Sequence, residues 1–123
     1  MPESDGLKRF GAHQKALALF DQVVGDLASL AREPACQRLV SPQIASADSI
    51  AANIEEGYGR GSKRDYAHFL IIARGSAQET RGRYERLKRW ISPEVIAPRV
   101  ALSDEIIAIL TATIRRLREQ DRE

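Results

Sequence analysis

The stretch from Ser49 to Glu79 constrains the fold of this chain more than any other part of its sequence. It reads as the end of one helix, a glycine-bearing turn, and the first half of a longer helix. Gly57 is placed to take the left-handed backbone conformation that ends a helix. Ser62 can cap the next helix, with Asp65 three residues later as its capping-box partner. We therefore predict a helical hairpin whose turn lies near residue 60.

Length and composition indicate one compact domain. A chain of 123 residues with 43% hydrophobic and 29% charged residues suits a helical domain, which we expect to span residues 1–123 after a loosely ordered lead-in over residues 1–10. The longest apolar run is far shorter than the ~20 residues of a membrane span, and the N-terminus lacks the apolar core of a secretory signal. Cys36 is the only cysteine, which excludes a disulfide framework. We expect a cytoplasmic protein without a membrane partner.

Apolar periodicity predicts four helices. The first covers about residues 12–31, the second begins at Ser41-Pro42 after a connection over residues 34–41, and the third covers about residues 63–90. The last is capped by Ser103 after a connection over residues 91–102. The first helix carries a stripe of Ala16, Phe20, Val23, Leu27 and Leu30, widened by Leu17, Val24 and Ala31. The predicted fold is all-α, an up-down-up-down four-helix bundle with a long third helix.

The third predicted helix has more apolar surface than one bundle can cover. Its seam follows 4, 3 spacing through Tyr66, Leu70, Ala73, Ala77, Thr80, Tyr84 and Leu87. Small or apolar residues also stand away from this seam. Since large exposed apolar patches on monomers usually mark interaction surfaces, we predict an oligomer interface at His68, Ile71, Ile72, Gly75 and Gly82.

Positive charge is concentrated in the middle of the sequence. Residues 57–90 contain nine basic and three acidic side chains, whereas residues 1–56 contain five basic and eight acidic ones. A basic stripe on a helix can contact RNA phosphates, although such stripes are more often only solvated. The candidate nucleic-acid contacts are Arg60, Lys63, Arg64, Arg74, Arg81, Arg83 and Arg86, followed by Lys88 and Arg89.

No arrangement of residues indicates catalysis, a cofactor or a metal. Adjacent Glu55 and Glu56 point about 100° apart on a helix and cannot flank one substrate bond. His13 and His68 have no ligands at metal spacing. The glycine-rich turn from Gly57 to Ser62 follows a helix and not the strand of a dinucleotide fingerprint, although the free N–H groups of the next helix leave a weak anion site open beside Arg60, Lys63 and Arg64. We expect no enzyme; a hydrolase using Glu56 and His68 is the weakest alternative.

The hairpin resembles the signature of the proteins encoded within intervening sequences of bacterial 23S ribosomal RNA genes. The matching residues in its first half are Ser49, Ile50, Asn53, Ile54, Glu56, Gly57, Gly59 and Arg60, and those in its second half are Phe69, Leu70, Ala73, Gly75, Ser76 and Glu79. Glu55 stands where the family usually has alanine, Thr80 where it has leucine, and His13 where the first helix often has an aromatic residue. Among the matching residues, we expect Ser49, Asn53, Glu56, Gly57, Ser76 and Glu79 to have structural roles, satisfying helix ends or ion pairs.

The resemblance implies a four-helix bundle that assembles into a ring-like homo-oligomer, typically a pentamer. It also implies similarity to the accessory protein of diversity-generating retroelements, which binds a reverse transcriptase and nucleic acid. Two functions follow: a non-enzymatic oligomeric adaptor associated with RNA or a reverse transcriptase, or a structural or protein-binding homo-oligomer without a nucleic-acid role.

Overall fold

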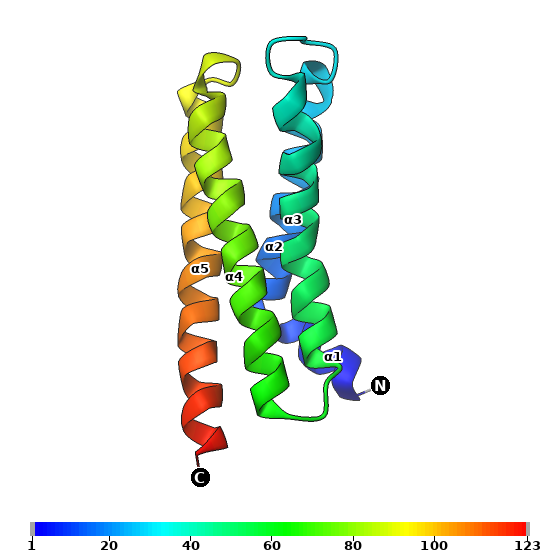
Figure 1. Cartoon of the computed structure of the whole chain (residues 1–123), viewed down its shortest axis with the longest axis vertical. Coiled ribbons are helices and arrows are strands. Elements are labelled where there is room, and N and C mark those ends of the chain that lie inside the picture. Colours follow the sequence, from blue (N-terminus) through cyan, green and yellow to red (C-terminus); the bar gives the residue numbers. More distant parts are fainter. Residues whose placement is uncertain (1, 123) are drawn as a thin grey trace.

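The computed structural model describes the backbone of residues 2–122 and the side chains of residues 6–122, and every regular element in it is helical (Figure 1). The elements are α1 (Pro2–Arg9), α2 (Gly11–Leu27), the 3-10 turn η1 (Ala28–Leu30), α3 (Gln37–Tyr58), α4 (Lys63–Arg86), the 3-10 turn η2 (Leu87–Arg89) and α5 (Pro93–Asp121). Four of these helices are long, and the predicted all-helical class is confirmed.

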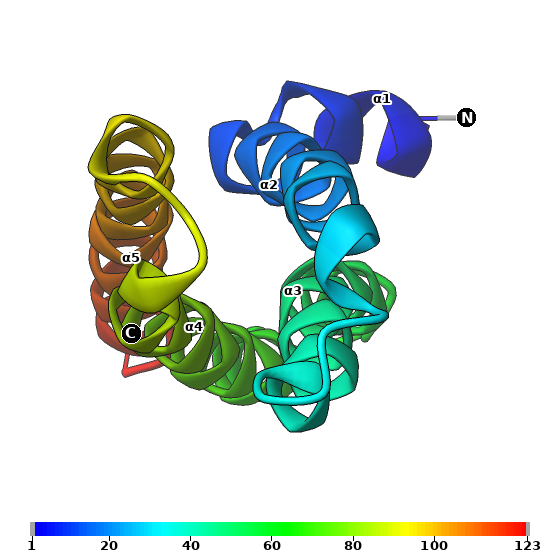
Figure 2. The same ribbon diagram turned by 90° about the horizontal axis from the view of Figure 1, so that it is seen from above.

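The long helices α2, α3, α4 and α5 lie side by side, and α1 folds against one end (Figures 1 and 2). The turn between α3 and α4 and the connection between α4 and α5 lie at opposite ends of α4. Helix α4 packs along both α3 and α5, while α2 packs against α3 and, less extensively, against α5. The core therefore lies between α2, α3, α4 and α5.

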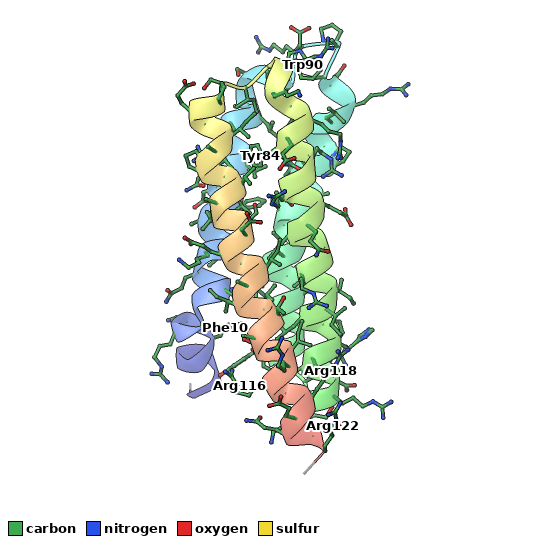
Figure 3. All side chains as sticks on the ribbon, turned by 90° about the vertical axis from the view of Figure 1, so that its left-hand side faces the viewer. Phe10, Tyr84, Trp90, Arg116, Arg118 and Arg122 are labelled. Carbon is green, nitrogen blue, oxygen red and sulfur yellow. The ribbon has the colours of Figure 1, made fainter. Side chains whose placement is uncertain are left out.

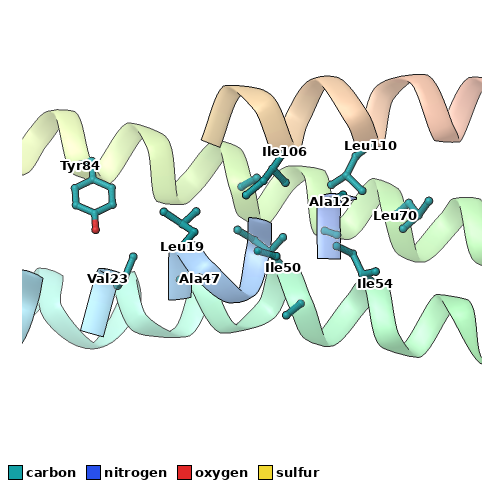
Figure 4. Close-up of a cluster of buried hydrophobic side chains, with 14 of the residues drawn as sticks. Ala12, Leu19, Val23, Ala47, Ile50, Ile54, Leu70, Tyr84, Ile106 and Leu110 are labelled. Atoms are coloured by element: carbon teal, nitrogen blue, oxygen red, sulfur yellow. The ribbon is translucent and has the colours of Figure 1, made fainter. Parts of the chain in front are cut away.

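The core draws large aliphatic side chains from all four long helices (Figure 4). Leu19 of α2, Ile50 of α3, Leu70 of α4 and Ile106 of α5 are completely buried. The predicted seam of α4 is confirmed, because Leu70, Ala73, Ala77, Thr80, Tyr84 and Leu87 are buried and Tyr66 is half-buried. Spacing of four and three residues thus identified the inner face of this helix correctly.

The widening of the α2 stripe was predicted on the wrong flank. Leu17 and Val24 are 44% and 41% exposed, and it is Leu19 that is fully buried. The buried line runs through Ala12, Ala16, Leu19 and Val23, among others. Apolar residues stand on both flanks of this helix, so the positions of its neighbours decide which flank is covered.

Two predicted helix starts are wrong for the same reason. Helix α3 begins at Gln37 and contains Pro42, and α5 begins at Pro93, after Ser92, and contains Pro98. Each internal proline is the sixth residue of its helix, where its missing N–H removes a single bond near the helix start. Consequently Ser103 is not a cap: it is buried within α5 and donates to the Arg99 carbonyl at 2.8 Å. With 29 residues, α5 is longer than α4 with 24.

The first residues, expected as a loose lead-in, contain helix α1. Gly6 lies so close to the Tyr58 hydroxyl that a Cβ atom there would overlap it, and Leu7 packs against the core. The lead-in is thus docked on the end of α3. The sequence of residues 1–10 has no apolar stripe from which a helix could be predicted.

The backbone of Gly57 contradicts the predicted left-handed cap. Among residues 2–122 no residue has a positive φ, and α3 continues to Tyr58, with Gly59 as its C-cap at φ −77°. Gly57 is instead required by packing: a Cβ atom there would lie 2.8 Å from the Cβ of Phe69. The predicted cap of the next helix is confirmed, because the Asp65 N–H donates to Ser62 Oγ at 3.1 Å.

Candidate functional site

The polar residues of the hairpin motif lie mainly in the interface between α3 and α4. Asn53 donates to the Ser49 carbonyl at 2.8 Å and to Ser49 Oγ at 2.9 Å. Ser49 Oγ in turn accepts from Ser76 Oγ of α4 at 2.9 Å. Each hydroxyl and amide thus finds a partner in the interface, which is the requirement for burying such groups.

A second polar cluster lies further along the same interface. Gln43 of α3 donates to the Thr80 carbonyl at 2.8 Å, and the Ser46 and Thr80 hydroxyls lie 2.7 Å apart. Arg83 donates to Gln43 Oε1 at 2.9 Å and to Ser46 Oγ at 3.0 Å. Burial and repulsion by Arg86 lower the pKa of Arg83. Thr80 is therefore bonded on both its backbone and side chain to the facing helix.

The two motif glutamates differ in their surroundings. Glu56, expected to satisfy a helix end or an ion pair, forms an ion pair with Arg60 at 2.8 Å. Glu79, for which the same role was expected, is exposed and forms no ion pair within the described side chains. Within the described side chains, neither glutamate lies within hydrogen-bond distance of a histidine. The structure therefore gives no geometric support to a hydrolase that uses Glu56 and His68.

Several candidate RNA-binding cations already have protein partners. Arg60 bonds Glu56 and lies over the Phe69 ring, 5.0 Å from its centroid. Arg81 bonds Asp104 at 2.6 Å, and this contact raises its pKa. Arg74 donates to Thr111 Oγ at 3.3 Å. With Arg83 committed to α3, these side chains help hold the helices together.

Lys63 and Arg64 instead line a hollow between α4 and α5. Its volume is about 380 Å³, and Arg118 and Arg122 from the end of α5 lie on its other side (Figure 3). A second hollow of about 310 Å³ shares Arg118 and Arg122 and adds Arg74 and Arg115, among others. We call these two hollows together the α4–α5 groove.

Sequence reasoning missed the α5 side of this groove. Arg115, Arg116 and Arg118 lie near the C-terminal end of α5, where the helix dipole alone accounts for cations, and Arg122 follows them. The spacing of three and four residues places Arg115, Arg118 and Arg122 on one face of the helix, and that was the available signal. That this face meets the start of α4 follows only from the fold.

The predicted interface residues divide between two surfaces. His68 and Ile71 line the groove. Ile72 is 39% exposed, and a Cβ atom added to Gly75 would meet no atom within 4 Å. At Gly82 the only neighbour of such an atom is the end of the Arg86 side chain, at 3.4 Å.

A partly buried ion pair that sequence reasoning did not single out joins α2, α4 and α5. Asp26 accepts from Arg99 Nε at 2.8 Å and Nη2 at 3.0 Å, and from the Tyr84 hydroxyl at 2.7 Å. Burial raises the pKa of the Asp26 carboxyl, but the bonds from Arg99 and Tyr84 outweigh it and leave that pKa below its ordinary value. Burial and the Asp26 carboxylate raise the pKa of Tyr84.

The other singled-out groups have ordinary structural surroundings. Cys36 is buried, with its thiol 3.8 Å from the Leu30 carbonyl, as expected for a small apolar side chain. In the part of the chain that the structure describes, no three His, Cys, Asp or Glu side chains gather in a way that could hold a metal ion. None of the described helices is long and apolar enough to cross a membrane.

Residues 8–112 match the family model described as "23S rRNA-intervening sequence protein". Among solved structures, the chain is similar to a protein of unknown function from the S23 ribosomal protein family of Bacteroides thetaiotaomicron. The two are 28% identical with a TM-score of 0.78, and the match covers 84% of this chain and 97% of that one. No curated protein matches the sequence.

Proposed function

This chain belongs to the 23S rRNA-intervening sequence protein family, and we propose on that premise that it is a non-enzymatic, homo-oligomeric adaptor associated with nucleic acid. The proposed subunit is an up-down-up-down four-helix bundle, and the proposed assembly is a ring of about five chains with a heterologous contact between neighbours. RNA or a reverse transcriptase is the proposed partner, in the cytoplasm.

The observation that carries the proposal is the outer face of α4. Ile72 is exposed there, and Gly75 has open space where a side chain would stand. Glycine inside a helix costs about 1 kcal/mol relative to alanine, and no packing among the residues that the structure describes accounts for Gly75. A neighbouring subunit that approaches closely would account for both residues.

Unpaired positive charge on α4 supports contact with a polyanion. Arg64 and Arg86 are exposed on α4 without an ion pair among the described residues. When such cations neutralise phosphates of a nucleic acid, the counterions condensed on those phosphates are released, and this release favours binding.

A second function, a protein-binding homo-oligomer without nucleic acid, is favoured by a different observation. Arg60, Arg81 and Arg83, three of the cations predicted to bind RNA, are engaged within the chain. If the remaining cations only keep the surface solvated, the outer face of α4 has a role in assembly and none in RNA binding.

Two measurements on the intact protein separate these functions. Light scattering coupled to size exclusion at micromolar concentration should give about five chains for the ring, whereas a monomer would contradict both functions. Binding of a structured RNA, followed by fluorescence anisotropy, should weaken steeply as salt is raised. An oligomer that binds no RNA at low salt would leave the protein-binding function.

A further inference from the structure

We propose that the α4–α5 groove is a binding site for single-stranded RNA, with phosphates held by the α5 arginines and a base held against the groove floor. This inference rests on the proposed nucleic-acid function and assigns it a site. Arg118 and Arg122 are its central residues, because both hollows share them.

The charge of the groove favours an anion. Its walls carry six cationic side chains and two carboxylates, Glu119 and Asp121. None of the six cations, which are Lys63, Arg64, Arg74, Arg115, Arg118 and Arg122, forms an ion pair within the described side chains. Outside the groove four cations, Lys15, Arg60, Arg81 and Arg99, form ion pairs within the described side chains, and nine others do not. The groove thus gathers six cations with no acidic partner among the described side chains, and of these Arg74 donates a hydrogen bond to Thr111.

The floor of the groove selects among anions. Ala67, Ile71 and Leu117 line the first hollow together with Lys63 and Arg118, and Ala67 and Leu117 are its buried apolar members. A phosphate gains nothing from contact with an apolar surface, whereas an unstacked base has an apolar face that can pack against such a surface. Duplex RNA keeps its bases stacked inside and cannot present them to a hollow of about 380 Å³. Apolar floor and cationic walls together fit a nucleotide unit of a single strand.

The shape of the groove indicates more than one nucleotide. The second hollow, of about 310 Å³, continues the first past Arg118 and Arg122 towards Arg74 and Thr111. A volume of about 300 Å³ is at the lower limit of small-molecule sites, so each hollow is suited to one nucleotide. A strand that fills both places its linking phosphate at the shared arginines.

The test measures binding of a labelled single-stranded RNA of about 12 nucleotides by fluorescence anisotropy over a salt series. Reversing both shared arginines, Arg118→Glu with Arg122→Glu, should weaken binding at least about tenfold and reduce the slope of log K against log salt by about 1.4, the value for two lost phosphate contacts. The milder pair Arg118→Gln with Arg122→Gln avoids acidic residues near a helix C-terminus and should show the same direction. Circular dichroism verifies that each variant keeps its helices.

The matched control is Arg32→Glu with Arg38→Glu, which changes net charge equally at exposed arginines near the opposite end of the bundle. Its affinity should stay within about threefold of the parent, because charges beyond a Debye length are screened. Equal weakening by the groove and control pairs would overturn the groove while leaving general RNA binding intact.

Further arms identify the ligand. Duplex RNA of the same length should bind more weakly than the single strand, and uridine monophosphate should compete only weakly. A duplex that binds equally well, or a mononucleotide that competes as well as the oligonucleotide, would overturn the proposed ligand. A parent protein that binds neither RNA at low salt would reject the nucleic-acid function itself, together with the groove.

Discussion

The Nε2 atom of His13 on α2 lies 2.8 Å from Oε2 of Glu55 on α3. By the resemblance noted for the hairpin, an aromatic residue and an alanine are expected at these two positions. The His13 side chain is 10% exposed and that of Glu55 49% exposed. The two residues therefore meet in space and form a polar contact between α2 and α3.

This pairing predicts coupled effects of substitution. Glu55→Ala alone should lower the free energy of unfolding by about 1 kcal/mol, because it leaves a buried imidazole nitrogen without its partner. The double variant Glu55→Ala with His13→Phe should lower the free energy of unfolding by less than the sum of the two single changes. The expected coupling energy is about 0.5–1 kcal/mol. Urea unfolding of the four proteins of the cycle measures this, and strict additivity would show that the contact contributes nothing.

Gly57→Ala should lower the free energy of unfolding by about 1–3 kcal/mol, because overpacking outweighs the higher helix propensity of alanine. The reason is the close approach of Phe69 and Tyr66, whose nearest atoms would lie 2.8 and 3.0 Å from the new Cβ. Gly61→Ala is the matched control: a Cβ atom there meets nothing within 4 Å, and the φ of Gly61 is not positive. Thermal melting should separate the two variants; equal melting temperatures would remove the packing argument.

Asp26→Asn should destabilise the protein at neutral pH by roughly 2–3 kcal/mol, because Arg99 loses its charged acceptor in a partly buried site. The pKa of Asp26 is depressed in the fold, so its contribution is fully present above the unfolded pKa near 3.8 and is lost as pH falls through the folded pKa. The difference in stability between parent and variant should accordingly shrink below about pH 4. Urea unfolding at several pH values measures it, and a difference independent of pH would contradict the pair's role.

Ile72→Glu should dissociate the proposed oligomer without changing helical content, because its side chain is 39% exposed and lies outside the core. Gln78→Glu, exposed on the same helix but outside the predicted interface, gains the same charge and should leave the assembly intact. Light scattering gives the mass and circular dichroism the helicity. Loss of helicity in the Ile72 variant would mean that this residue supports the fold of the single chain.

The hairpin was predictable because its signals are local. Ser62 and Asp65 form the expected cap, and the residues from Leu70 to Leu87 at 4, 3 spacing form the buried seam of α4. Capping depends on residues three apart, and amphipathic periodicity depends on one helix alone. Both can be read before any partner helix is known.

The predictions for Pro42, Pro98 and Gly57 were wrong because local sequence rules carry no information on the tertiary packing that a helix gains in the fold. Pro42 and Pro98 lie inside α3 and α5, since one lost hydrogen bond is outweighed by packing of the whole helix. Gly57 has the signature of a helix stop, but its missing side chain admits Phe69. The sequence contains the glycine in either case and cannot distinguish the two reasons.

By itself the sequence determined the helical class, the hairpin and the inner face of α4, because periodicity and capping act over a few residues. Only the tertiary structure decided which flank of α2 is buried, which arginines are bonded within the chain, and which lie unpaired around the groove. Lys63 and Arg118 stand 55 positions apart in the sequence and border one hollow. Such a meeting depends on how α4 and α5 pack along their length, and no local pattern encodes it.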